Sequence, residues 1–276
     1  MLPLELVALV FALGAGVFGA LAGVGGGLVV VPLLAIFLGV PLHNAIAVSL
    51  LGVIAVSTTA SANYLEAGLV SRRLGLALLS ATTVGGIIGG YTAGLVDARV
   101  LAAVFGVVLI VVALRMLLGH EAEVAEIIDE PGRFEFDAAY VESRTGEEVE
   151  YRVRNLGPGA VVSVFAGIMS GLLGVGGGVI NVPTMNVLMG IPIRVATTTS
   201  TYMLGATAVA SAVLYFSRGE VDPALAGAVV VGSVTGARIG ARLQHRLPSR
   251  ALTLIFVVVS AVFAIQMLLR ALGPQV

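Results

Sequence analysis

The chain is an internal duplication. Its second half repeats the first without a gap, at an offset of 151 residues that aligns position 23 with position 174. Residues 23–27 (GVGGG) correspond to 174–178 (GVGGG), and the Val-Pro pair at 31–32 corresponds to 182–183. A repeat of this length means that one structural unit is built twice. The fold must therefore contain two equivalent halves.

Composition places both halves in a membrane. Hydrophobic residues make up 58% of the chain and charged residues 11%, and the mean hydropathy is +1.06. Soluble domains carry about 25% charged residues, and apolar runs of about 18 or more residues are typical of membrane spans. The chain has no cysteine and its three histidines are scattered. We therefore expect an all-α integral membrane protein in the lipid bilayer, with no metal, no cofactor and no nucleic-acid partner.

Each half divides into five hydrophobic segments, and the second segment of each half is short. The predicted segments are 4–22, 28–38, 44–64, 74–95 and 99–118 in the first half, and 158–173, 179–189, 195–216, 223–243 and 250–271 in the second. Eleven helical residues span about 16 Å, whereas the hydrocarbon core of a bilayer is about 30 Å thick. Segments 28–38 and 179–189 are therefore predicted to be half-membrane helices.

The loop charges indicate that the halves have opposite orientations. In the first half the basic loop follows the third segment and contains Arg72 and Arg73. In the second half the basic loop comes one segment later and contains Arg242, His245, Arg246 and Arg250. Basic loops lie in the cytoplasm, so equivalent loops lie on opposite sides of the membrane. We predict two inverted-topology repeats in the plasma membrane, with both termini outside and the linker between the repeats in the cytoplasm.

That linker is strongly acidic. Residues 119–156 hold eleven acidic residues and four arginines, a net charge of −7. Two alternating stretches, FEFDAAYVE and EEVEYRVRN, flank residues 144–146 and predict a small β-hairpin. The predicted organisation is a first transmembrane repeat at 1–118, the linker at 119–156 and a second transmembrane repeat at 157–276. The linker is interpreted as a tether, with a regulatory or partner-binding role as the alternative.

The paired glycine runs predict a substrate site. Consecutive glycines break a helix, and broken backbone at membrane depth is tolerated where it is buried in protein or lines a cavity. The half-helix that follows each run offers unpaired N–H groups and the positive end of its dipole, which attract anions. Glycine also lets a ligand approach the backbone closely. Inverted repeats bring two such breaks together near the midplane. The alternative is a tight hinge between packed helices that binds no ligand.

Neutral hydrogen-bonding groups accompany these runs. The predicted membrane segments contain almost no carboxylates, which disfavours a cation or proton-relay site, whereas hydroxyls and amides are plentiful. We therefore predict a site for a small oxyanion, with Ser49 and Ser200 as equivalent hydroxyls in the two repeats. The candidate substrate-binding residues are Gly23, Gly25, Gly26, Gly27, Ser49, Gly174, Gly176, Gly177, Gly178, Asn181, Thr199 and Ser200.

Two further patterns concern packing and access. Glycines at a four-residue spacing, such as Gly85 with Gly89 and Gly232 with Gly236 and Gly240, predict close contact between helix backbones. Arg238 lies deeper within its segment than the other membrane arginines. It is a candidate for anion entry, with contact to the lipid headgroups as the alternative.

The doubled motif resembles a known family. Two copies of G-x-G-G-G-x-x-x-x-P, followed by GVPLHNAIAVSLL in one half and GIPIRVATTTSTY in the other, are similar to the sulfite exporter TauE/SafE family over roughly 4–118 and 157–271. The family's usual Ala-Thr-Ser appears here at 47–49 as Ala-Val-Ser and at 198–200 as Thr-Thr-Ser. The resemblance implies a secondary transporter in the plasma membrane for small sulfur-containing anions such as sulfite, thiosulfate or an organosulfonate.

The sequence and the resemblance together predict a transporter rather than an enzyme. We expect export of a small sulfur-containing anion by alternating access around a midplane site, in a monomer or a homodimer. An anion channel that uses the glycine-rich site as a filter is the alternative. An intramembrane enzyme is disfavoured because the sequence offers no Ser/His/Asp, paired-acid or metal-ligand constellation.

Overall fold

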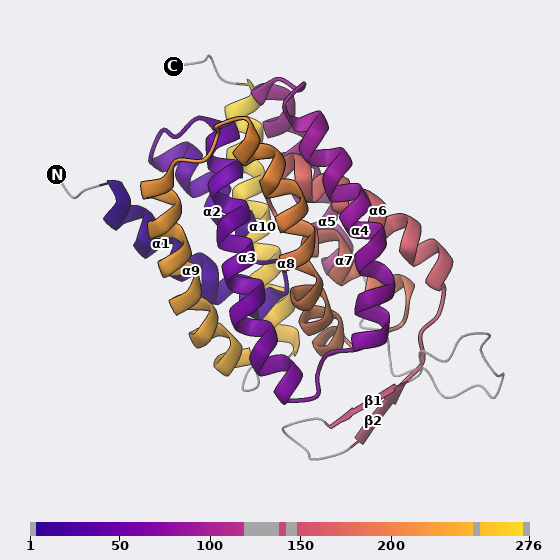
Figure 1. Ribbon diagram of the computed structural model, residues 1–276. Coiled ribbons are helices and arrows are strands. Elements are labelled where there is room, and N and C mark those ends of the chain that lie inside the picture. Colours follow the sequence, from indigo (N-terminus) through magenta and orange to yellow (C-terminus); the bar gives the residue numbers. More distant parts are fainter. Residues whose placement is uncertain (1–3, 119–137, 142–147, 245–248, 273–276) are drawn as a thin grey trace.

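Helices of both halves lie side by side in one bundle (Figure 1). The computed structural model describes residues 4–118, 138–141, 148–244 and 249–272. In Figure 1 the beginning of α1 and the end of α10 lie toward the upper end of the bundle, and a two-stranded hairpin lies at the lower end. Five of the described helices, α1, α3, α4, α6 and α9, are long and apolar enough to cross a bilayer. The chain is an all-α membrane protein.

The helices of the two halves begin and end at equivalent positions. The first half contains α1 (Leu4–Ala22), α2 (Gly27–Pro32), η1 (Leu33–Phe37), α3 (Leu42–Glu66), α4 (Arg72–Ala93) and α5 (Ala98–Leu118). The second contains α6 (Leu156–Leu173), α7 (Gly178–Pro183), η2 (Thr184–Leu188), α8 (Ile193–Ser217), α9 (Pro223–Gln244) and α10 (Ser249–Leu272). Every bound lies within two residues of its predicted hydrophobic segment, because glycine, proline and charge mark the segment ends.

The two short helices are not continuous α-helices. The sequence predicts one helix over 28–38, but α2 ends at Pro32 and continues as the π-helix η1. Proline has no N–H to donate and its ring disturbs the preceding turn, so the hydrogen bonds widen after it. Pro183 has the same effect between α7 and η2.

Helices of one half pack against helices of the other. The pairs are α1 with α9, α6 with α4, α3 with α8, and α5 with α10. A Cβ at Gly85 or Gly89 would overlap the backbone of α6, and one at Gly236 would overlap the backbone of α1. The close packing predicted from the glycine spacing is thus confirmed.

The centre and the surface of the bundle suit a lipid environment. Val53 of α3 and its equivalent Leu204 of α8 are fully buried where these two helices meet. Large apolar side chains face outward on several helices, including Val10 of α1, Val84 of α4 and Val231 of α9. Exposed apolar surface on this scale is expected where lipid replaces water.

The linker contributes one small sheet. Strands β1 (Ala138–Val141) and β2 (Glu148–Tyr151) pair antiparallel, with Ala138 opposite Tyr151. The turn predicted at 144–146 lies outside the described residues.

Candidate functional site

The two glycine runs have the same backbone conformation. We call residues 23–27 the first break and residues 174–178 the second break. In the first break Gly23, Gly25 and Gly26 have φ angles of 74°, 72° and 80°. The second break repeats them at Gly174, Gly176 and Gly177, with 69°, 78° and 77°. Residues with a side chain rarely adopt positive φ, so each of these six positions favours glycine.

The breaks touch each other in the middle of the bundle. A Cβ at Gly27 would overlap the carbonyl oxygen of Gly174, and one at Gly178 would overlap that of Gly23. A Cβ at Gly25 or at Gly176 would lie 2.7 Å from the same atom, Cγ1 of Val53. The structure therefore brings the glycines of both candidate runs to one place. All of them are buried.

The candidate serines each reach the break of the opposite half. The Ser49 Oγ of α3 donates to the Gly174 carbonyl oxygen at 2.8 Å. The Ser200 Oγ of α8 donates to the Gly23 carbonyl oxygen at 2.9 Å. Both serines are fully buried. Each hydroxyl hydrogen is thus engaged by a carbonyl at the point where an oxyanion is predicted to bind.

Two equivalent tyrosines hold the helices that precede the breaks. The Tyr64 hydroxyl donates to the Ala20 carbonyl oxygen in the last turn of α1, at 2.8 Å. The Tyr215 hydroxyl donates to the Gly171 carbonyl oxygen in the last turn of α6, at 2.9 Å. Carbonyls at a helix end lack intrahelical partners, so the tyrosines stabilise α1 and α6 where these helices stop.

Asn181 and Thr199 occupy different surroundings. Asn181 lies in α7 and is 1% exposed, and its Oδ1 has no hydrogen-bond partner among the described residues. Thr199 is also buried, but its Oγ1 accepts the Ser71 backbone N–H at 3.0 Å. Thr199 therefore joins α8 to the loop before α4. Asn181 remains available to a ligand.

Arg238 stands apart from these residues. It is exposed on α9 beside Ile239, which is itself 48% exposed. Its role in anion entry stays a prediction.

A buried arginine at the start of α8 was not anticipated from the sequence. Arg194 is 3% exposed and its Nη1 lies 3.5 Å from the Gln244 carbonyl oxygen at the end of α9. The equivalent residue of the first half, His43, has its Nε2 3.1 Å from the Ala93 carbonyl oxygen at the end of α4. A basic side chain at a helix C-terminus is favourable. The alignment of Arg194 with His43 was the signal available in the sequence.

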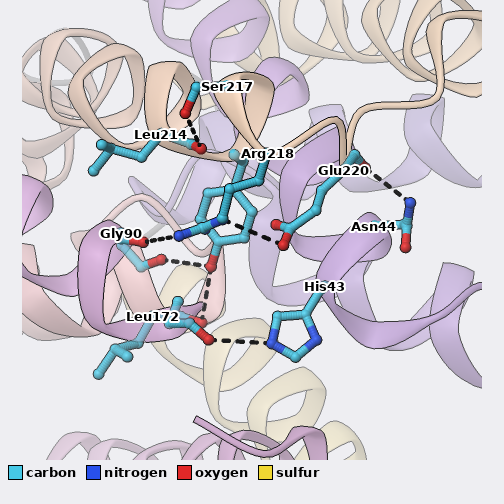
Figure 2. Close-up of polar contacts among 11 residues, drawn as sticks. His43, Asn44, Gly90, Leu172, Leu214, Ser217, Arg218 and Glu220 are labelled. Carbon is cyan, nitrogen blue, oxygen red and sulfur yellow. Dashed lines mark hydrogen bonds and ion pairs between the residues drawn. The ribbon is translucent and has the colours of Figure 1, made fainter. Parts of the chain in front are cut away.

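Polar contacts also join the halves where α3 begins and α8 ends (Figure 2). The Arg218 guanidinium pairs with Glu220 at 3.2 Å, donates to the Gly90 carbonyl oxygen at 2.9 Å and lies over the Tyr215 ring. The Asn44 Nδ2 donates to the Glu220 carbonyl oxygen at 3.0 Å. The loop after α8 is thereby attached to α3 and α4 of the first half.

The segment that leaves the hairpin covers the turn after η2. The Arg154 N–H donates to the Met189 carbonyl oxygen at 3.1 Å, and the Asn155 Nδ2 donates to that of Leu188 at 2.9 Å. Tyr151 is hydrogen-bonded to the Ser71 side chain; burial raises the pKa of its phenol, and this bond lowers it in part. The linker therefore contacts both Ser71, just before α4, and the turn after η2.

Comparisons with known proteins give one matching family model and two similar membrane transporter proteins. The sequence model of the sulfite exporter TauE/SafE family matches residues 8–267. The probable membrane transporter protein YunE of Bacillus subtilis (strain 168) is 26% identical over 271 residues, covering 95% of this chain and 96% of YunE. YdhB of the same organism, also a probable membrane transporter protein, is 21% identical over 233 residues, covering 84% and 87%. No solved structure matches the chain.

Proposed function

The chain belongs to the sulfite exporter TauE/SafE family, and we propose that it is a secondary transporter that exports a small sulfur-containing anion: sulfite, thiosulfate or an organosulfonate. The observation that carries this proposal is the reciprocal contact of the two glycine breaks. Each break is bound by the serine of the other half, Ser49 on Gly174 and Ser200 on Gly23. Such a site belongs to neither half alone, so relative motion of the halves opens and closes it.

In the proposed topology the halves are inverted repeats at 1–118 and 157–276, joined by a cytoplasmic linker at 119–156. Both termini lie outside the plasma membrane. The equal offsets of the helices and the reciprocal pairing of α1 with α9 and of α6 with α4 support this arrangement. The hairpin also lies at the opposite end of the bundle from the start of α1 and the end of α10 (Figure 1).

On substrate binding, the Ser49 and Ser200 hydroxyls would exchange a backbone carbonyl acceptor for the oxyanion. With the breaks in contact, the Ser49 and Ser200 hydroxyls donate to backbone carbonyls. When the breaks separate, an oxyanion can enter between them and accept the same two O–H groups, which suits hydroxyls because bonds to a charged acceptor are stronger. Packing of Gly27 on Gly174 and of Gly178 on Gly23 leaves no room for it before separation. Rocking of one half against the other then exposes the anion to either side in turn.

The membrane potential favours export. An inside-negative potential contributes about 2.3 kcal/mol per charge per 100 mV to the outward movement of an anion.

One chain contains both breaks, so a monomer holds a complete site, and a homodimer would hold two.

Counterflow of radiolabelled sulfite and thiosulfate in proteoliposomes tests the proposal. A transporter preloaded with unlabelled anion accumulates label transiently, and the Ser49→Ala, Ser200→Ala double variant should lower this uptake about tenfold or more, since two bonds to a charged group are lost. Unitary currents far above carrier turnover would instead identify a channel. Wild-type vesicles that move neither anion would exclude both substrates.

A further inference from the structure

Two buried polar side chains at the second break replace apolar residues at the first. Asn181 of α7 aligns with Val30 of α2, and Ser170 of α6 aligns with Gly19 of α1. All four positions are buried. The backbones of the breaks match, so this difference in side chains is a difference in chemistry rather than in fold.

Each of the two polar side chains at the second break has an atom that no described residue satisfies. The Asn181 Oδ1 and the Ser170 Oγ have no hydrogen-bond partner among the described residues, although Asn181 is 1% exposed and Ser170 is 0% exposed. A buried serine in a helix can bond to a carbonyl of the preceding turn, and Ser49 and Ser200 donate to the break of the opposite half. A buried polar group without a partner is a candidate for contact with a ligand or an ordered water.

Both side chains border the same glycine. A Cβ at Gly177 would lie 3.4 Å from the Ser170 Cβ. The Asn181 backbone N–H donates to the Gly177 carbonyl oxygen at 3.0 Å, so Asn181 lies one helical turn after Gly177. Helical side chains lean toward the N-terminus of their helix, which directs the Asn181 carboxamide back toward Gly177. Ser170 and Asn181 thus approach the second break from α6 and α7.

The first break has no space for such groups. A Cβ at Gly19 would overlap the backbone nitrogen of Gly26, so α1 packs directly on the first break. The Val30 side chain has no hydrogen-bonding group. The first break is therefore closed by backbone contact and apolar packing, and the second is bordered by two unsatisfied polar side chains.

We propose that the oxyanion is held mainly at the second break, where Ser170 and Asn181 add side-chain donors to those of Ser49 and Ser200. This inference rests on the proposed function and adds Ser170 to the substrate site. Helices α6, α7, η2 and α8 contain no acidic residue that would balance a bound cation. The Ser170 O–H and the Asn181 amide N–H₂ are donors, and rotation of the carboxamide about χ2 turns either end toward the ligand.

Transport kinetics of single variants test the one-sided site. The variants are Ser170→Ala and Asn181→Val, the latter installing the residue of the first half. The matched controls are Val30→Thr, at the equivalent position of the first break, and Ser260→Ala, which removes from α10 a buried serine that has no partner in the described part of the chain. We expect the KM for radiolabelled sulfite or thiosulfate to rise about tenfold in each test variant and to stay within about twofold in the controls.

Ligand stabilisation of purified protein gives a second readout. Sulfite or thiosulfate should raise the Tm of the wild type and of both controls, and should raise that of Ser170→Ala and Asn181→Val less. If the wild type transports the anion and both test variants keep its KM, the one-sided site is wrong while the proposed function stands. If sodium rather than either anion gives the stabilisation that the variants lose, the site binds a cation and the inference is overturned. A wild type that moves neither anion refutes the proposed function itself.

Discussion

The two glycine breaks share a backbone and differ in the side chains around it. Their positive φ angles agree within a few degrees, and the serine bonds that cross between the halves measure 2.8 and 2.9 Å. Around the second break, however, Ser170 and Asn181 stand where the first has Gly19 and Val30. The two halves share the glycine conformations and the crossing serine bonds, whereas the side chains around the two breaks have diverged.

The surroundings of the two short helical segments, α2–η1 and α7–η2, also differ. In the second half the turn after η2 is covered by the hairpin exit, and Met189 is fully buried. The equivalent Leu38 is partly exposed, and a Cβ at Gly39 would meet no atom within 4 Å. We call the two breaks and the serine bonds between them the frame; it is symmetric, and equivalent mutations in its two halves should have equal effects. The side chains around the breaks and the contacts of the hairpin exit are asymmetric, and mutations there should have an effect in one half only.

The largest effect is expected from substitutions where the two breaks touch. Gly27→Ala and Gly178→Ala each place a methyl group against a carbonyl oxygen of the opposite break, and should lower the free energy of unfolding by about 3 kcal/mol or more. Equal loss in both variants, measured as thermal unfolding of detergent-purified protein, would support a symmetric frame. Gly227→Ala is the control, because a Cβ there meets no atom within 4 Å. A wild-type Tm in either variant would contradict the close contact.

The crossing serines should give a smaller and again equal effect. Ser49→Ala leaves the Gly174 carbonyl without its hydroxyl partner, and Ser200→Ala does the same for Gly23. Hydrogen bonds between membrane helices contribute about 0.6 to 2 kcal/mol, so each variant should lose that amount in chemical unfolding. A loss confined to one of the two would show that the frame itself is asymmetric.

The tyrosines sharpen the comparison further. Tyr64→Phe and Tyr215→Phe each remove the hydroxyl that donates to the last turn of α1 or α6 and retain the buried ring. We expect a loss of about 0.6 kcal/mol in each, from the same unfolding measurement. Replacement of Tyr64 by Leu, which also changes the ring packing, should cost more than Phe. If the Phe variant were as destabilised as the Leu variant, the ring packing would contribute nothing beyond the hydroxyl, which would contradict this prediction.

Sequence predicted the frame because its determinants are local. Apolar segments, the glycine runs and the prolines at 32 and 183 mark helix ends directly, and the offset of the repeat relates the two halves. The change to a π-helix after Pro32 was missed because both helix types follow the same apolar run. The short-helix bounds were still predicted to within a residue, since Gly27 and Gly39 border them.

The hydrogen-bond partners of the buried polar groups could not be predicted from the sequence. Ser49 was selected as a ligand residue from its equivalence with Ser200, but the acceptors of both hydroxyls lie more than a hundred residues away. Ser170 was overlooked, although its alignment with Gly19 was visible, because a lone serine in a helix is usually bonded to its own backbone. That it is unpartnered depends on the packing of α6 against the second break, which follows from the tertiary structure.

The smallest expected effect concerns the contact of the hairpin exit with the end of η2. Asn155→Gly removes the side-chain bond to Leu188 while allowing the φ of 51° that residue 155 adopts. Stability should fall by about 0.5 kcal/mol, the contribution of one partly exposed hydrogen bond. Hydrogen exchange should accelerate over 184–191 and should not change over 33–40, where no linker contact is described. Asn155→Ala adds backbone strain at positive φ, so it should lose more stability than Asn155→Gly with the same local change in exchange. Acceleration in both segments would mean that the hairpin exit acts on the whole frame, and the asymmetry would then extend beyond the second half.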